Sequence, residues 1–222
     1  MVNFMSKPLL TIEGLLKEAI LFSEMESKYD EPALFGVTDG KAVGTYLEHK
    51  FRTFLIGTYD FHLGNSASGI DFPQLNIDMK VKSIKQPQSS CPYKSARQKI
   101  FGLGYSLLIF VCDKYDDHEN RTGRLDMKHT IFVDSARTAD YQMTRGLNEI
   151  IDRDGNEDDI IAFLSDKNLP VDEIEAGNIA RSILQQRPLQ GYLTISNALQ
   201  WRLQYSRVIS QAGSINGIER VR

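Results

Sequence analysis

Apolar and polar positions along the first two-thirds of the chain follow patterns that predict both helices and strands. Apolar residues recur every three or four positions in some segments, as on one face of a helix, and every second position in others, as on a half-buried strand. Asp39 stands where it can cap the second of the helices. The predicted elements of this part are helices over 9–27, 41–56 and 94–102 and strands over 76–84, 105–112 and 129–134.

The last third of the chain has helical spacing throughout. Its predicted helices cover 141–151, 157–167, 171–186 and 194–210, with breaks rich in Gly, Pro and Asn between them. The last helix carries two apolar stripes, one of them formed by Trp201, Tyr205 and Val208, which indicates burial on two sides, against the core or a partner subunit. Arg202 and Arg207 are candidates for phosphate contact, although packing explains this segment better.

This order of elements predicts the α/β class, with a mixed central sheet flanked by helices and a helical C-terminal part. At 222 residues the chain has the length of one large domain, or of one domain with an appendage. We expect an N-terminal helix and loop (1–40) packed on the core, a core (41–135) that carries the chemistry, and a helical C-terminal subdomain (136–222).

Composition excludes several classes of protein. Hydrophobic residues make up 41% and charged residues 25%, as in an ordinary soluble globular protein. The longest apolar run, 107–112, is far shorter than the roughly 20 residues that cross a bilayer. Only Cys91 and Cys112 are present, so a disulfide framework is not expected and a reducing cytoplasm is the simplest location.

Charge is distributed unevenly, although the net charge is only −3. Residues 79–112 contain six Lys or Arg and no acid, and residues 181–222 contain six Arg and the single acid Glu219. Two basic tracts within an acidic chain suit a protein that meets a polyanion along selected faces. Scattered solvated charge explains either tract alone about equally well.

The most informative stretch combines two acids and a lysine. Asp78 and Lys80 lie two apart on the predicted strand 76–84, so their side chains share a face. Asp71 precedes a turn signal at Pro73, and a hairpin there brings its carboxylate across to Asp78. Two carboxylates this close repel each other, and a hard divalent cation such as Mg²⁺ relieves the repulsion. This set fits hydrolysis of a phosphodiester bond, and the alternative is a structural ion cluster.

These residues in this order resemble the PD-(D/E)xK nucleases and, among them, the type II restriction endonucleases. Asp71 matches the first acid of the family, Asp78 the second, and Lys80 the lysine, while Ile70 stands where the name-giving proline would be. Glu48, on the preceding helix, resembles the further metal-associated acid of the family, and a salt-bridged glutamate is nearly as good an explanation. The resemblance covers roughly residues 43–134 and implies a restriction-endonuclease-like fold with Mg²⁺ as the cofactor.

The polar loop that follows the strand offers partners for nucleic acid. Its side chains include phosphate partners and groups able to hydrogen-bond base edges, next to a nuclease motif. An ordinary solvated loop is the alternative. The candidate DNA-binding residues are Lys82, Lys85, Gln86, Gln88, Ser89, Ser90, Lys94 and Arg97.

The resemblance therefore implies a Mg²⁺-dependent type II restriction endonuclease that cuts double-stranded DNA at a specific sequence. Asp71, Asp78 and Lys80 are its expected catalytic residues with Glu48 as a further one, and the three acids are the expected metal ligands. A palindromic target requires two copies of the site, so we expect a symmetric homodimer, with 136–222 serving dimerisation, DNA contact or both. The rival hypotheses are a repair nuclease or junction resolvase of the same fold, and a DNA-binding module without turnover.

Overall fold

The computed structural model describes residues 7–62, 64, 69–195 and 202–222. The chain forms two compact units, each assembled from segments that are not contiguous. The first comprises Met1–Pro87, Leu107–Phe132 and Ala212–Arg222, and the second comprises Gln88–Ser106 and Val133–Gln211. The sequence prediction of three consecutive segments differs from this division, in which the chain returns to the first unit twice.

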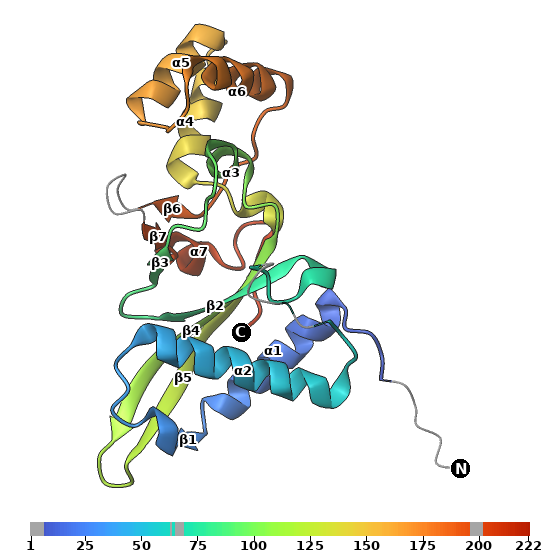
Figure 1. Ribbon diagram of the computed structural model, residues 1–222, viewed down its shortest axis with the longest axis vertical. Coiled ribbons are helices and arrows are strands. Elements are labelled where there is room, and N and C mark those ends of the chain that lie inside the picture. The colour runs from blue at the N-terminus through green and yellow to red at the C-terminus, as the bar shows by residue number, and fades with distance from the viewer. Residues whose placement is uncertain (1–6, 63, 65–68, 196–201) are drawn as a thin grey trace. The chain divides into compact units, whose positions relative to one another are not determined.

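The first unit is built around a central sheet, as the α/β prediction requires. Its strands are β1 (Asp30–Glu31), β2 (Ile77–Ser83), β4 (Ser106–Asp117), β5 (Thr122–Val133) and β8 (Ile218–Arg220). They lie in the order β1-β5-β4-β2, and β8 also pairs with β5 (Figure 1). Strands β4 and β5 are joined by only four residues, so they form an antiparallel hairpin.

Two long helices, α1 (Ile12–Glu26) and α2 (Gly40–Thr58), lie side by side in the first unit, and α2 packs on β2 (Figure 1). The Thr11 side chain caps α1 by accepting from the backbone N–H of Gly14 at 3.1 Å. Asp39 caps α2 as predicted, because its two carboxylate oxygens accept from the first backbone N–H groups of the helix. Both predicted helices are confirmed.

An aromatic cluster fixes α2 against the sheet. The ring of Phe51 on α2 lies 4.9 Å from that of Phe22 on α1 and 5.2 Å from that of Phe110 on β4. All three side chains are buried, and Leu47 and Leu55 extend the same buried stripe along α2. Burial of this stripe determines which face of α2 is turned towards β2.

The second unit combines a helical cluster with a small sheet (Figure 1). Its helices are α3 (Ala96–Phe101), α4 (Tyr141–Asp152), α5 (Glu157–Asp166), α6 (Glu173–Gln185) and α7 (Ser206–Gln211). Its strands are β3 (Gln88–Ser90), β6 (Thr194–Ile195) and β7 (Arg202–Gln204), in the order β3-β7-β6. The helices predicted over 141–151, 157–167 and 171–186 are confirmed to within about two residues.

Three predicted elements differ from the structure. The helix predicted over 194–210 is wrong, since the described part of it contains β6, β7 and only the short α7; Trp201 lies outside the described residues. Leu203 and Tyr205 are buried two positions apart, which is the period of a strand. The loop predicted over 85–93 contains β3, and β5 begins well before the predicted start at 129. Strand β3 is stabilised by β7, which is remote in sequence, and the first part of β5 pairs both with β4 in the hairpin and with the remote β1. Local composition does not reveal the remote partners.

None of the helices in the described part of the chain has the length and apolar character needed to cross a membrane.

Candidate active site

A tight hairpin brings the two predicted acids together. The backbone N–H of Phe72 donates to the carbonyl of Ile77 at 2.9 Å, and that of Ile77 donates back to Phe72 at 3.2 Å. A turn of 3₁₀ helix over Pro73–Leu75 makes the bend between them. Because Phe72 and Ile77 face each other in an antiparallel bridge, the same register sets Asp71 opposite Asp78. The hairpin predicted at Pro73 is confirmed.

The Asp71 carboxylate is held from two sides. Its Oδ2 accepts from the backbone N–H of Met79 at 2.7 Å, and its Oδ1 pairs with the guanidinium of Arg52. Asp78 is buried, and burial raises the pKa of its carboxyl to about 6, a shift to which Asp71 adds and which Lys80 opposes. The hairpin thus sets the Asp71 and Asp78 side chains next to each other at the start of β2.

Strand β2 carries a row of charge beside these acids. Lys80 Nζ lies 2.5 Å from Asp78 Oδ2. Lys82, two residues further along, shares this face of the strand, and burial together with the positive charge of Lys80 lowers the pKa of Lys82 to about 8. The alternation that buries Ile77 and Met79 therefore places the acid and both lysines along one line.

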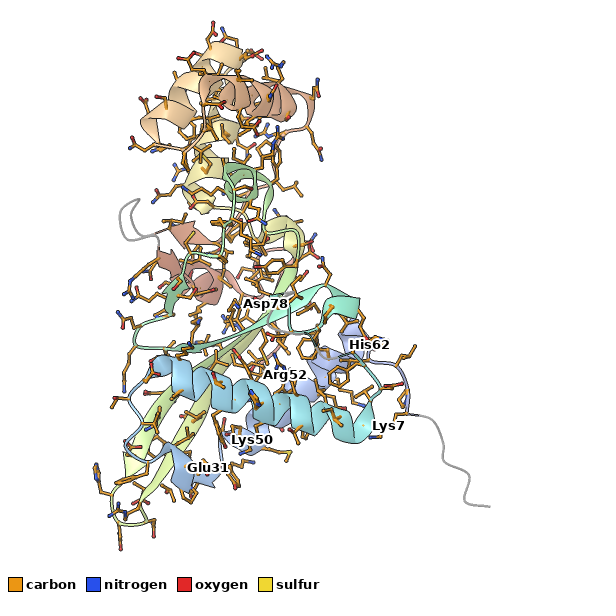
Figure 2. The ribbon with its side chains drawn as sticks, in the orientation of Figure 1. Lys7, Glu31, Lys50, Arg52, His62 and Asp78 are labelled. Atoms are coloured by element: carbon orange, nitrogen blue, oxygen red, sulfur yellow. The ribbon has the colours of Figure 1, made fainter. Side chains whose placement is uncertain are left out.

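Helix α2 supplies the other side of the site. Glu48 and Arg52 are four residues apart on the helix, so they lie on the same face, next to the buried stripe that contains Phe51. Burial, and then the negative charge of Asp71, raises the pKa of Glu48. Figure 2 shows Arg52 on α2 and Asp78 on the neighbouring β2.

Arg52 is the residue of this site that the sequence analysis missed. Its Nε is buried and has no hydrogen-bond partner within the described part of the chain, although its Nη2 pairs with Asp71. A buried donor left unsatisfied is costly and calls for a ligand or a function. The signal was present in the sequence, since Arg52 lies one helical turn after Glu48 on the same face.

The donor set fits a hard divalent cation held by two carboxylates. Mg²⁺ usually takes one or two protein carboxylates and completes its shell with water and substrate phosphate oxygens. Asp71 and Asp78 meet this requirement, and a bound cation would favour the ionised form of Asp78, whose pKa is raised chiefly by burial and to a smaller degree by Asp71. No group of three His, Cys, Asp or Glu side chains able to hold a metal was found in the described residues, so a metal role for Glu48 stays a prediction.

The predicted DNA-binding residues fall in both units. Lys82, Lys85 and Gln86 belong to the first unit, and Gln88, Ser89, Ser90, Lys94 and Arg97 to the second. Lys85 pairs with Asp113 at 2.8 Å but is largely exposed, and Lys94 is exposed too. Arg97 pairs with Glu175 at 2.9 Å, which neutralises its charge within the second unit. A phosphate contact by Arg97 is therefore the least favoured of the set.

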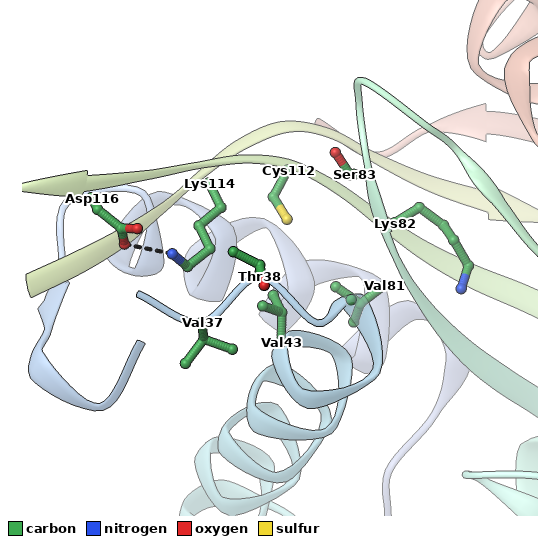
Figure 3. Close-up of a pocket in the computed structure, with 10 residues that line it drawn as sticks. Val37, Thr38, Val43, Val81, Lys82, Ser83, Cys112, Lys114 and Asp116 are labelled. Atoms are coloured by element: carbon green, nitrogen blue, oxygen red, sulfur yellow. Dashed lines mark hydrogen bonds and ion pairs between the residues drawn. The ribbon is translucent and has the colours of Figure 1, made fainter. Parts of the chain in front are cut away.

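A pocket of about 300 Å³ lies between the start of α2 and strands β2 and β4 (Figure 3). Val43, Val81 and Cys112 form its apolar wall, and Lys114 and Asp116 pair with each other at its rim. Burial raises the pKa of the Cys112 thiol to about 11, so the thiol stays protonated at neutral pH. A protonated thiol is a weak nucleophile, so Cys112 contributes to this pocket as part of its apolar wall.

Comparison with known proteins gives a consistent result over almost the whole chain. The family described as type II restriction enzyme NspV matches residues 9–220. The type II restriction enzyme NspV of Nostoc sp. is 67% identical over 210 residues, which cover 95% of this chain and 96% of that protein. No solved structure gave a significant match. The chain therefore belongs to the NspV family of type II restriction enzymes.

Proposed function

We propose that this chain is a Mg²⁺-dependent restriction endonuclease that hydrolyses phosphodiester bonds in double-stranded DNA at a specific sequence. The observation that carries the proposal is the pairing of Asp71 with Asp78 across the hairpin, with Lys80 at 2.5 Å from Asp78. Two carboxylates and an ammonium group in a small volume are what in-line attack of water on a phosphodiester requires. Membership of a restriction enzyme family supports the same reading.

Asp71 and Asp78 would hold Mg²⁺ together with an oxygen of the scissile phosphate. When bound, the ion supplies Lewis-acid polarisation of the phosphate and stabilises the leaving oxygen. The backbone N–H of Met79 fixes the orientation of the Asp71 carboxylate for this task. Arg52 and Lys80, which pair with these carboxylates in this structure, would be released from that role by a bound cation.

Lys80 and Arg52 then interact with the scissile phosphate. The Lys80 ammonium group orients the attacking water and stabilises the charge that develops on the non-bridging oxygens. The guanidinium of Arg52 also contributes donors to the phosphate, and its unsatisfied Nε–H is one of them. The attacking water forms the new bond to phosphorus and releases a proton to solvent. The bond from phosphorus to the 3′ oxygen breaks and that oxygen takes up a proton from solvent, which leaves a 5′-phosphate and a 3′-hydroxyl.

We infer a symmetric homodimer, because a palindromic site presents the same cleavage point once on each strand and one copy of the chain carries one carboxylate pair. Such an enzyme meets its DNA in the cytoplasm, and we place the chain there.

The test is plasmid cleavage by the purified protein with Mg²⁺, compared with Asp78→Ala and Lys80→Ala variants. We expect discrete fragments from the wild type and none from either variant. Asp126→Ala is the matched control, since Asp126 is a half-exposed acid of the first unit, on β5, that pairs with Lys128 at 2.5 Å. This control should cut like the wild type.

Three results would contradict the proposal. Discrete fragments from Asp78→Ala would show that cleavage does not require the carboxylate pair. Cleavage confined to branched DNA would indicate a repair nuclease or resolvase. Binding to DNA without cleavage under any Mg²⁺ concentration would indicate a module that does not turn over.

A further inference from the structure

The small sheet of the second unit is where the two basic tracts of the sequence meet. Strand β3 comes from the tract 79–112, and β7 comes from the tract 181–222. These strands are more than 110 positions apart in the chain, and they pair antiparallel, with Gln88 opposite Gln204 and Ser90 opposite Arg202. The small sheet thus joins one strand from each tract (Figure 1), and Arg202 is the charged residue of its three strands.

One face of this sheet is buried. Leu203 and Ile195 face each other across β7 and β6, and both are buried. Ser89, opposite Leu203 on β3, lies within hydrogen-bonding distance of the buried Tyr205, with 3.0 Å between the two hydroxyl oxygens. Since neighbouring residues of a strand point to opposite faces, the residues on either side of this row form the other face.

The other face carries polar side chains that are half-exposed or exposed. None of the residues on this face that pair between the strands is an acid. The residues at these positions are Gln88, Ser90, Thr194, Arg202 and Gln204. Arg207 lies beside them, with its Nε 3.4 Å from Thr194 Oγ1 and its guanidinium 3.6 Å from the ring centre of Tyr141. Amides, hydroxyls and arginines without acids match the chemistry of a nucleic-acid contact.

The two glutamines are held together. Gln204 Nε2 donates to Gln88 Oε1 at 2.9 Å, so each amide fixes the orientation of the other. That bond uses the amide nitrogen of Gln204 and the amide oxygen of Gln88. The amide oxygen of Gln204 can still accept a hydrogen bond from a ligand, and the amide nitrogen of Gln88 can still donate one. Adenine shows the complementary pattern in the major groove, an N7 acceptor beside an N6 donor, and glutamine is a usual partner for it.

We propose that this face of the β3-β7-β6 sheet reads the DNA sequence, with the Gln88–Gln204 amide pair contacting an adenine in the major groove and Arg202 contacting a flanking phosphate. The inference rests on the proposed endonuclease function and adds a specificity element to it. A β-ribbon fits the width of the major groove, and a pre-ordered amide pair loses little side-chain entropy on binding. Ser89, a predicted DNA contact, is turned inwards and takes no part.

The experiment begins by mapping the wild-type cut site on plasmid DNA. Cleavage and, with Ca²⁺ in place of Mg²⁺, binding are then measured on a short duplex carrying that site and on duplexes with one base pair changed at each position. The variants are Gln88→Ala, Gln204→Ala and Arg202→Ala. Gln185→Ala and Arg153→Ala are matched controls, exposed in the same unit and away from the sheet.

We expect each glutamine variant to cut the mapped site about ten- to hundredfold more slowly and to lose discrimination at one A·T position. Arg202→Ala should weaken binding to all duplexes to a similar degree and lower the salt dependence. The controls should behave like the wild type, and melting temperatures will show whether each variant is folded.

Unchanged discrimination in folded glutamine variants would overturn the base-reading role. An equal loss of cleavage on all duplexes would overturn the base-reading role too, because it would indicate that the glutamines contact the DNA backbone. Failure of the wild type to cut any DNA would instead refute the proposed function, so the two failures are distinguishable.

Discussion

Replacing Asp78 by asparagine should stabilise the metal-free protein. The pKa of the Asp78 carboxyl rises from 3.8 to about 6 in the folded state, chiefly because the group is buried. One pKa unit corresponds to about 1.4 kcal/mol, so the ionised carboxylate costs the fold about 3 kcal/mol near neutral pH. Asparagine has nearly the same shape and no charge. The substitution also removes the carboxylate that pairs with Lys80, and loss of this ion pair cancels part of the gain in stability.

We expect a net gain in unfolding free energy of about 1–2 kcal/mol at pH 7, or a rise in melting temperature of about 5 °C. The sign follows from proton binding: a carboxyl with a raised folded pKa binds more protons in the folded state, so wild-type stability falls as the pH rises from about 4 to about 6. The two proteins should therefore be similar at pH 4 and differ at pH 7.

The assay is thermal unfolding by circular dichroism, with and without Mg²⁺, at several pH values. Mg²⁺ should raise the melting temperature of the wild type and leave that of Asp78→Asn unchanged. Asp126→Asn, on the exposed face of β5, is the control and should change little at any pH. A variant less stable than the wild type at pH 7 without metal would refute the reasoning.

Three further outcomes are expected. The apparent affinity for Mg²⁺ should fall about tenfold per pH unit below the Asp78 pKa of about 6, because the ion needs the ionised carboxylate; calorimetric titration at pH 5, 6 and 7.5 checks this, and equal affinities would contradict it. Phe51→Ala should lower the free energy of unfolding by about 3–5 kcal/mol, since the ring is fully buried among other rings; urea denaturation measures the loss, and a loss under 1 kcal/mol would show that the cluster does not stabilise the unit. Arg52→Ala should slow single-turnover cleavage about 100-fold without weakening Mg²⁺ binding, and an intact rate would exclude a phosphate role for Arg52.

The hairpin, the strand and the helix that carry the candidate catalytic residues could be predicted because each is marked by residues close together in the sequence. Asp71 and Asp78 are seven residues apart, and a proline between them marks the turn that pairs them. The strand period of two aligned Asp78 with Lys80, and Asp39 marked the start of α2. Each of these follows from neighbours in the sequence.

The parts that escaped prediction depend on distant partners. Strand β3 has the composition of a loop and is extended because β7, more than 110 positions later, supplies its hydrogen bonds. The segment that contains Leu203 has enough apolar residues to imitate a helix, and its pairing with Ser89 and Ile195 reveals a strand. The position of Arg52 one turn after Glu48 is a weak local signal, and its ion pair with Asp71 across the helix–hairpin contact depends on a partner 19 positions later.

The way β8 joins the first sheet affects how this unit folds. Thr130 exchanges backbone hydrogen bonds with Val221 and Arg222, and β8 pairs with β5. About 90 residues of sequence separate Thr130 from Val221, and most of them belong to the second unit. Closing so long a loop costs entropy before the pairing of β8 can repay it, so we expect β8 to join the sheet late in folding. The hairpin of β4 and β5, which closes over only four residues, is the part of the same sheet expected to form early.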